Sequence, residues 1–140
     1  MEGWRVSDGV VIGRMEVMTV KGVLIVGHGS RRRETEMILE SVVEMAKKEI
    51  QEIPMEIAYM EFGTQDIPTA LDTLLNKGVD DIAVVPYFLY DGMHIKKDIP
   101  EELEKYRLTH PGIKISMGKP LGADERLAAI LADRIRDACE

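Results

Sequence analysis

The segment GVLIVGHGS, residues 22–30, joins a short apolar run to two glycines that flank a histidine. A continuous apolar run of this length, ended by glycine, is typical of a strand buried on both faces of a parallel sheet. Beyond the loop, apolar residues recur from position 34 to position 50 at helical spacing, with Glu and Lys between them. This spacing predicts an amphipathic helix. Residues 22–50 therefore form a strand–loop–helix unit.

The same order of elements recurs three more times. A strand is predicted for residues 55–62, where apolar residues alternate with period two. Asp66 is a plausible N-cap, and Pro68 lies in the first turn of the helix that follows. The other predicted strands are residues 81–86 and 113–117, and the predicted helices are residues 67–76, 100–108 and 124–138. The strand at 113–117 is the least apolar, which places it near an edge of the sheet.

Alternating strands and helices with short connections predict parallel pairing and right-handed crossovers. We therefore expect a single-domain α/β fold: a three-layer sandwich with a mainly parallel four-stranded sheet and helices on both faces. Residues 21–140 form this domain. Residues 1–20 are an N-terminal extension, either a flexible tail or an extra strand.

Composition excludes several classes of protein. The net charge of −7 argues against a general nucleic-acid binder, because neutralising phosphates needs a basic face. The single cysteine, Cys139, allows neither an internal disulfide nor a multi-cysteine metal site. No apolar run is long enough to cross a bilayer, and we expect no secretory leader, because the first residues lack a charged segment followed by a long apolar one. We expect a cytoplasmic protein that does not insert in a membrane.

The loop after the first strand fails the common nucleotide patterns. In GHGSRR, Arg32 stands where a dinucleotide fingerprint needs its last glycine. The segment GIKISMGKP, residues 112–120, has one residue too many for a Walker loop, so no nucleotide cofactor is expected. A phosphohistidine site would place an arginine directly before His28, but Gly27 is there. Phosphoryl transfer at His28 stays open as a weaker alternative.

Ligands of open α/β sheets bind beyond the carboxyl ends of the strands. His28 follows the first strand, Glu61 the second and His94 the third. Imidazole suits divalent ions such as Co²⁺, Ni²⁺, Zn²⁺ and Fe²⁺, and a carboxylate adds an oxygen ligand or a base. His28 and His94 could equally be turn histidines bonded to backbone. His110, before Pro111 and Gly112, is expected at a helix end on the surface, outside the site.

Three segments together carry a family resemblance: LIVGHGSRRRE (24–34), MEF with DIPTAL (60–71), and VVPYFLYDGMHIKKDIPEEL (84–103). They resemble the small form of the ATP-independent cobalt chelatases, which is related to iron and nickel chelatases acting on sirohydrochlorin. The resemblance covers the chain from about residue 23 onward. It implies a chelatase-like α/β sandwich, a homodimer, and insertion of Co²⁺ into sirohydrochlorin in cobalamin biosynthesis. Nickel insertion for coenzyme F430 is a second implied role.

The resemblance maps the metal-binding histidines onto His28 and His94, and an additional metal-contacting glutamate onto Glu61. The carboxylates of sirohydrochlorin would need local basic groups on an acidic protein, and arginine binds carboxylates in a bidentate manner. The backbone N–H groups of Gly29 and Ser30 could bind a carboxylate as well. The expected basic contacts are Arg31, Arg32, Arg33, Lys96 and Lys97, and the expected contacts with the macrocycle are Tyr87, Phe88, Leu89, Tyr90 and Met93. The charges could instead be solvated, and the apolar side chains could belong to a core or a dimer interface.

The same site could serve a protein that carries a tetrapyrrole or a metal without catalysis. Enzymatic turnover separates that alternative from chelation, because only a chelatase gives an insertion rate that rises with the amount of protein.

Overall fold

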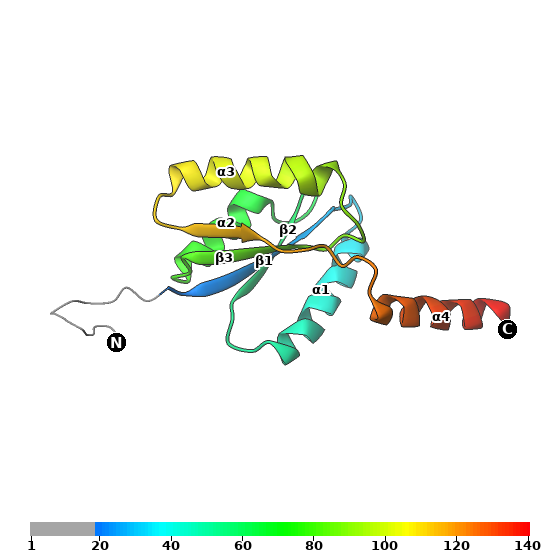
Figure 1. Cartoon of the computed structure of the whole chain (residues 1–140). Helices are drawn as coiled ribbons and strands as arrows, with labels where there is room; N and C mark the ends of the chain where they lie inside the picture. The colour runs from blue at the N-terminus through cyan, green and yellow to red at the C-terminus, as the bar shows by residue number, and fades with distance from the viewer. Residues whose placement is uncertain (1–18) are drawn as a thin grey trace.

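A computed structural model of the chain describes residues 19–140; most of the predicted N-terminal extension, residues 1–18, lies outside the described residues. Four strands and four α-helices follow one another in the expected order (Figure 1). The strands are β1 (Lys21–Gly27), β2 (Met55–Tyr59), β3 (Asp81–Pro86) and β4 (Lys114–Met117). The helices are α1 (Arg33–Glu49), α2 (Ile67–Asn76), α3 (Ile99–Thr109) and α4 (Glu125–Cys139).

All four strands are parallel and pair in the order β2-β1-β3-β4. The expected α/β class and the parallel sheet are confirmed, and β4 lies at an edge, as its weaker apolar character predicted. The connection from β1 leads outward to β2, whereas the connection from β2 crosses back over β1 to reach β3. The side of the sheet on which successive strands are added therefore changes between β1 and β3, although all four strands stay parallel.

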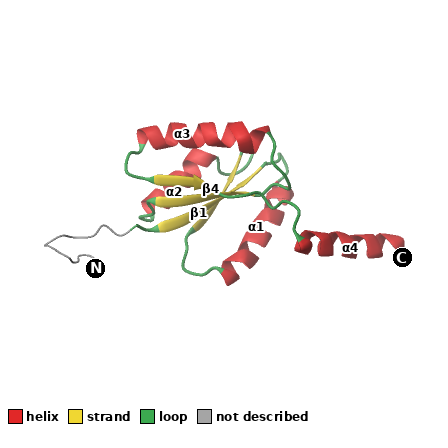
Figure 2. Ribbon diagram, in the orientation of Figure 1, coloured by secondary structure: helices red, strands yellow, loops and turns green. Residues whose placement is uncertain are grey.

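Alternate residues of β1 enter two different cores, which places helices on both faces (Figure 2). Leu24 and Val26 are fully buried with α2 and α3 on one face. Val23 and Ile25 face the other way and pack with Leu39 and Val43 of α1. The first core is larger and includes the fully buried Leu71, Leu74, Ile82, Val84 and Ile99.

Two segments differ from the sequence-based expectation. Strand β2 ends at Tyr59, because the chain turns sharply: the Tyr59 N–H donates to the carbonyl of Gln65, and Phe62 has a positive φ of 64°. The helix expected at residues 100–108 is preceded by a π-helical turn, His94–Asp98, that runs directly into α3. Turns of this kind occur often at functional sites.

Helix α4 extends beyond the carboxyl edge of the sheet instead of packing on it (Figure 1). Its start is well defined, because the Asp124 carboxylate accepts a hydrogen bond from the Arg126 N–H. Among residues 19–140 there is no helix with both the length and the apolar character to span a lipid bilayer.

Candidate metal site at the centre of the sheet

The two histidines of the predicted site follow the two central, hydrogen-bonded strands. His28 comes directly after β1, and His94 lies in the segment after β3. The direction of strand connection reverses between these two strands, so the loops that leave them diverge and open a crevice. A ligand site is expected at this point of an open α/β sheet.

The imidazole rings of His28 and His94 lie side by side. Their centroids are 5.1 Å apart with an interplanar angle of 80°, and the Phe88 ring lies 6.3 Å from each. Two imidazoles that bind one ion through nitrogens at about 2.1 Å have ring centres about 5 Å apart when the angle at the ion is tetrahedral. The observed spacing therefore suits a shared divalent ion.

Asp98 orients the second histidine. Its carboxylate lies 3.0 Å from His94 Nδ1, which leaves Nε2 as the ring nitrogen that can bind a metal. A carboxylate on the far nitrogen fixes the tautomer and increases the basicity of a histidine ligand. Asp98 was not among the residues predicted from the sequence. The spacing of four residues in HIKKD, on a helical turn, was the signal that could have identified it.

The loop after β1 is attached to the loop after β2. The N–H groups of Met60 and Glu61 donate to the carbonyls of Gly27 and His28, at 3.1 Å and 3.2 Å. Gly29 has φ of +98°, and a Cβ there would lie 1.8 Å from the Glu61 carbonyl oxygen. Only glycine allows this approach, so Gly29 determines how closely the two loops pack.

The buried carboxylate of Glu36 holds the loop after β2 in place. Glu36 is 3% exposed, and it accepts hydrogen bonds from the Thr64 N–H at 3.1 Å and from Arg33 at 3.3 Å. The Tyr59 hydroxyl donates to the Glu36 carbonyl at 3.4 Å. Burial, aided by the charges of Glu36 and Glu40, raises the pKa of Tyr59 to about 12, so this hydroxyl keeps its proton.

The backbone N–H of Glu61 contacts the site by donating to the His28 carbonyl, whereas the Glu61 side chain is exposed. Within residues 19–140, no three His, Cys, Asp or Glu side chains are grouped closely enough to bind one ion. The histidines are therefore brought together and Glu61 is not, so a role for Glu61 as ligand or base stays a prediction.

The basic residues after His28 differ in how far they are available to a ligand. Arg31 lies over the Phe62 ring at 4.1 Å, and Arg32 is exposed, 3.7 Å from Glu34. Arg33 forms two hydrogen bonds with Glu40, at 2.6 Å and 3.1 Å, which lower the pKa of that carboxyl. Its guanidinium is thus occupied within α1, and Arg31 and Arg32 are better placed to meet a carboxylate.

Two cavities adjoin His28. One, of about 360 Å³, is lined by His28, Phe88, Leu89, Tyr90, Gly92 and His94. The other, of about 250 Å³, includes Gly29, Ser30, Ile38 and Tyr87 in its lining. Tyr90 and Met93 are 76% and 64% exposed, so the predicted macrocycle contacts form an open apolar rim. Lys96 and Lys97 are exposed on the π-helical turn, and Lys97 lies 3.6 Å from Glu101.

His110 is remote from this arrangement, as expected. It is the C-cap residue of α3, and its ring stacks on Tyr106 with centroids 3.8 Å apart. Its Nδ1 lies 2.9 Å from the Tyr106 carbonyl. The third histidine is thus part of the helix end.

The sequence model of the CbiX family matches residues 22–138, which contain both site histidines and all of the strands and α-helices except Lys21 and Cys139 at the two ends. The chain belongs to the CbiX family.

Relatives of this CbiX chain fall into two lengths. It is 36% identical to a sirohydrochlorin cobaltochelatase of Sulfurisphaera tokodaii over 83% of this chain and 92% of that protein. It is 34% identical to a sirohydrochlorin ferrochelatase of Bacillus subtilis over 84% of this chain but only 45% of that protein. The chain thus spans about half the length of the longer curated relatives it matches.

Solved structures of two relatives superpose on this chain, and they too differ in how much of their length the chain covers. The sirohydrochlorin chelatase SirB from Bacillus subtilis subspecies spizizenii, in complex with cobalt, superposes with a TM-score of 0.79 at 34% identity, over 85% of this chain and 51% of SirB. A protein described as a putative cobalamin biosynthesis CbiX protein, from Marinobacter aquaeolei VT8, superposes with a TM-score of 0.71 at 28% identity, over 85% and 97% of the two chains. The expected chelatase-like fold is confirmed.

Replacing Gly29 with Ala should destabilise this CbiX chain by about 3 kcal/mol or more, because the new Cβ meets the Glu61 carbonyl and the backbone is left-handed. Gly78 is the matched control, since its φ is +86° but a Cβ there has nothing within 4 Å. We expect Gly78→Ala to cost about 1 kcal/mol. Urea unfolding measures both, and equal losses would contradict the close packing of the two loops.

Replacing Asp98 with Ala should weaken Co²⁺ binding by about 10- to 100-fold, because His94 loses the group that orients it. Asp98→Asn should keep most of the affinity, since its amide oxygen still accepts from Nδ1. Asp98 makes no side-chain cap on α3, so the helix should be retained. Isothermal titration with Co²⁺ measures the effect, with Glu101→Ala as control on the same helix. Unchanged affinity in Asp98→Ala would refute the orienting role.

Proposed function

We propose that this chain inserts a divalent metal into sirohydrochlorin without ATP, with Co²⁺ as the principal ion and Ni²⁺ as a second substrate. The observation that carries the proposal is the His28–His94 pair, 5.1 Å apart, at the switch point of a CbiX-family sheet. Relatives named as cobaltochelatases and ferrochelatases support the reaction class. The product would enter cobalamin biosynthesis, or coenzyme F430 biosynthesis when the ion is nickel.

Insertion requires the ion to lose water, the ring to present a nitrogen lone pair, and two pyrrole N–H protons to leave. Neutral imidazoles replace water around the ion and release it stepwise to the ring nitrogens. Asp98 holds His94 so that Nε2 stays available for this exchange. The open rim beside the pair leaves room for a macrocycle to approach the ion.

The two protons need an acceptor near the macrocycle. An imidazole that has given up its ion has a free ring nitrogen that can accept a proton. Glu61, exposed on the adjoining loop, is the second candidate acceptor. Arg31 and Arg32 would hold peripheral carboxylates, and Phe88 and Leu89 would contact the ring. We also propose that the active form contains two copies of the chain.

Removing either histidine should lower the insertion rate by about 100-fold or more, because one imidazole alone cannot hold the ion for transfer. The assay follows the spectral change of sirohydrochlorin on addition of Co²⁺, at several protein concentrations. His110→Ala is the matched control and should retain wild-type activity, because that ring lies at the end of α3.

Wild-type activity in the double variant His28→Ala/His94→Ala would refute the site. Binding of metal and ring without a rate that depends on protein would favour a carrier. Metal-independent hydrolysis of a phosphate ester that requires His28 but not His94 would favour phosphoryl transfer.

When each ion is supplied separately, insertion should be faster for Co²⁺ than for Ni²⁺. Nitrogen ligands bind Ni²⁺ more tightly than Co²⁺, so an imidazole pair releases Ni²⁺ to the ring more slowly. We expect faster initial insertion of Co²⁺ than of Ni²⁺ at saturating ion, measured with one protein preparation under anaerobic conditions. Faster insertion of Ni²⁺ than of Co²⁺ would contradict cobalt as the principal substrate of the two.

A further inference from the structure

Phe62, in the loop after β2, combines two features that are unusual for an aromatic residue. Its backbone is left-handed, with φ of 64°, and its side chain is 56% exposed. A bulky residue with positive φ is an outlier, and such a conformation persists only where surrounding contacts hold it. Residues of this kind cluster at binding sites, so a role in the histidine site is the first explanation to test for Phe62.

The backbone on each side of Phe62 is held by the rest of the protein. The N–H groups of the two residues before it donate to carbonyls of the first histidine loop, at 3.1 Å and 3.2 Å. Two residues after it, the Thr64 N–H donates to the buried Glu36 carboxylate at 3.1 Å. Gly63 lies so close to the Tyr59 ring that a Cβ there would be 2.4 Å from a ring carbon. The position of the Phe62 ring is therefore set by a fixed backbone.

The ring of Phe62 contacts the guanidinium of Arg31. The central carbon of that guanidinium, Cζ, lies 4.1 Å from the ring centroid. A guanidinium over an aromatic face is attracted by the ring quadrupole, and it uses none of its N–H donors in doing so. The contact joins the loop after β1 to the loop after β2, because Arg31 is three residues beyond His28 and Phe62 directly follows Glu61.

The three arginines of the first histidine loop differ in what their N–H groups contact. Arg33 donates twice to Glu40, at 2.6 Å and 3.1 Å, and Arg32 Nε lies 3.7 Å from Glu34. Within residues 19–140, the Arg31 side chain forms neither a hydrogen bond nor an ion pair, and its contact is the Phe62 ring. Arg31 is thus held in place while its five N–H donors remain available to a ligand.

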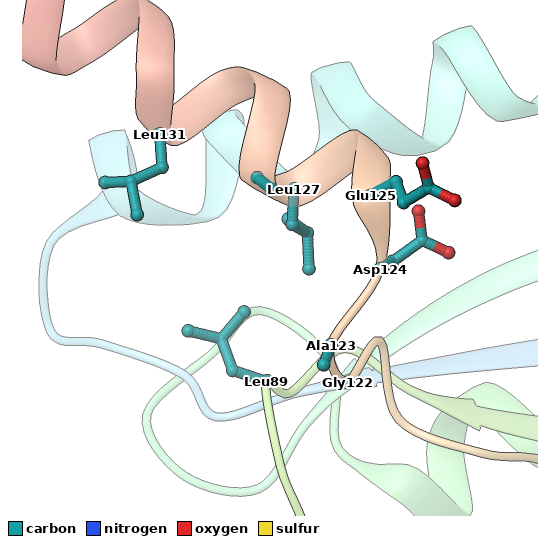
Figure 3. A pocket seen from close by; sticks show the side chains of 8 residues that line it. Leu89, Gly122, Ala123, Asp124, Glu125, Leu127 and Leu131 are labelled. Carbon is teal, nitrogen blue, oxygen red and sulfur yellow. The ribbon is translucent and has the colours of Figure 1, made fainter.

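The side of the rim that borders α4 is built differently. Leu89, which lines the cavity of both histidines, faces Leu127 and Leu131 across a second, open cavity of about 480 Å³ (Figure 3). The guanidinium of Arg126 at the start of α4 is occupied, because it donates twice to the Asp124 carboxylate, each time at 2.8 Å. A ligand with an apolar body and a carboxylate edge therefore meets apolar side chains here and an available guanidinium at Arg31.

We propose that Phe62 is a positioning residue, which holds the Arg31 guanidinium so that its N–H groups meet one peripheral carboxylate of the tetrapyrrole. The inference rests on the proposed function and deepens it, since it names the device that recognises the edge of the substrate. A guanidinium binds a carboxylate best through two parallel N–H···O bonds, which require a defined orientation of its plane. The ring orders the long Arg31 side chain before the substrate arrives, and this lowers the entropy cost of binding.

Binding of metal-free sirohydrochlorin to the full chain tests the role of the ring directly. Phe62→Leu keeps an apolar side chain but has no aromatic face, and it should raise the dissociation constant by about 3- to 10-fold. Phe62→Tyr keeps the aromatic face, so it is the matched control and should bind like the wild type. Quenching of the fluorescence of sirohydrochlorin measures binding, and circular dichroism checks that both variants fold.

A double-mutant cycle tests whether Phe62 acts through Arg31. Arg31→Ala should raise the dissociation constant of sirohydrochlorin by about 10-fold or more, because a charge-assisted hydrogen bond is lost. In the Arg31→Ala background, Phe62→Leu should add less than about 2-fold, since the ring then has no guanidinium to hold. The affinity for Co²⁺ without the macrocycle should stay unchanged in all of these variants, which separates a lost substrate contact from damage to the metal site.

Three results would overturn the positioning role: wild-type binding by Phe62→Leu, an equal loss in Phe62→Tyr, or full additivity of Phe62→Leu with Arg31→Ala. Co²⁺ insertion is assayed on the same samples. If Phe62→Leu inserts Co²⁺ with the KM and kcat of the wild type, the positioning role fails and chelation stands. Binding of sirohydrochlorin that depends on Phe62, without insertion by the wild type, supports the positioning role and refutes chelation. If the wild type does not bind sirohydrochlorin, both fail.

Discussion

The pairing of β1 with β3 is the constraint on which the candidate site depends. Six residues of each strand pair in parallel register, from Lys21 with Asp81 to Val26 with Pro86. This pairing brings the ends of the two strands together, and with them the segments that carry His28 and His94. Because the connection to β2 leaves one way and that to β4 the other, the loops separate above the sheet. The crevice is a consequence of strand order, and the two imidazoles occupy it.

Several contacts around the site keep the first histidine loop in place. Backbone hydrogen bonds connect it to the loop after β2, Gly29 permits the close approach, and the buried Glu36 holds the far side of that loop through Thr64. His94 is held differently, by Asp98 on its own π-helical turn. One histidine is thus positioned through the backbone and the other through its side chain, while the apolar rim beside them stays open.

Local patterns in the sequence predicted most of the fold. The apolar run at 22–27 and the helical spacing of residues 34–50 identified β1 and α1 to within a residue or two, because burial on a strand or helix leaves a short-range period. The pattern failed at β2, where alternation continued to Phe62 but the strand ends at Tyr59. A tight loop held by hydrogen bonds from Gln65 and Thr64 breaks the strand without interrupting the period. The same reasoning placed both histidines on one edge, yet missed Asp98, whose role depends on a π-helical turn.

By itself the sequence determined the α/β class, the parallel strands, and the positions of His28, Glu61 and His94 after successive strands. These follow from periodicity and chain order, which act between residues close in sequence. Only the tertiary structure decided that β1 and β3 are neighbours, that their histidines meet while Glu61 stays apart, that Arg33 is paired within α1, and that α4 leaves the sheet. The meeting of the two histidines depends on which distant segments pack together, and the last two depend on side-chain and chain geometry in three dimensions. A spacing pattern carries no information about either.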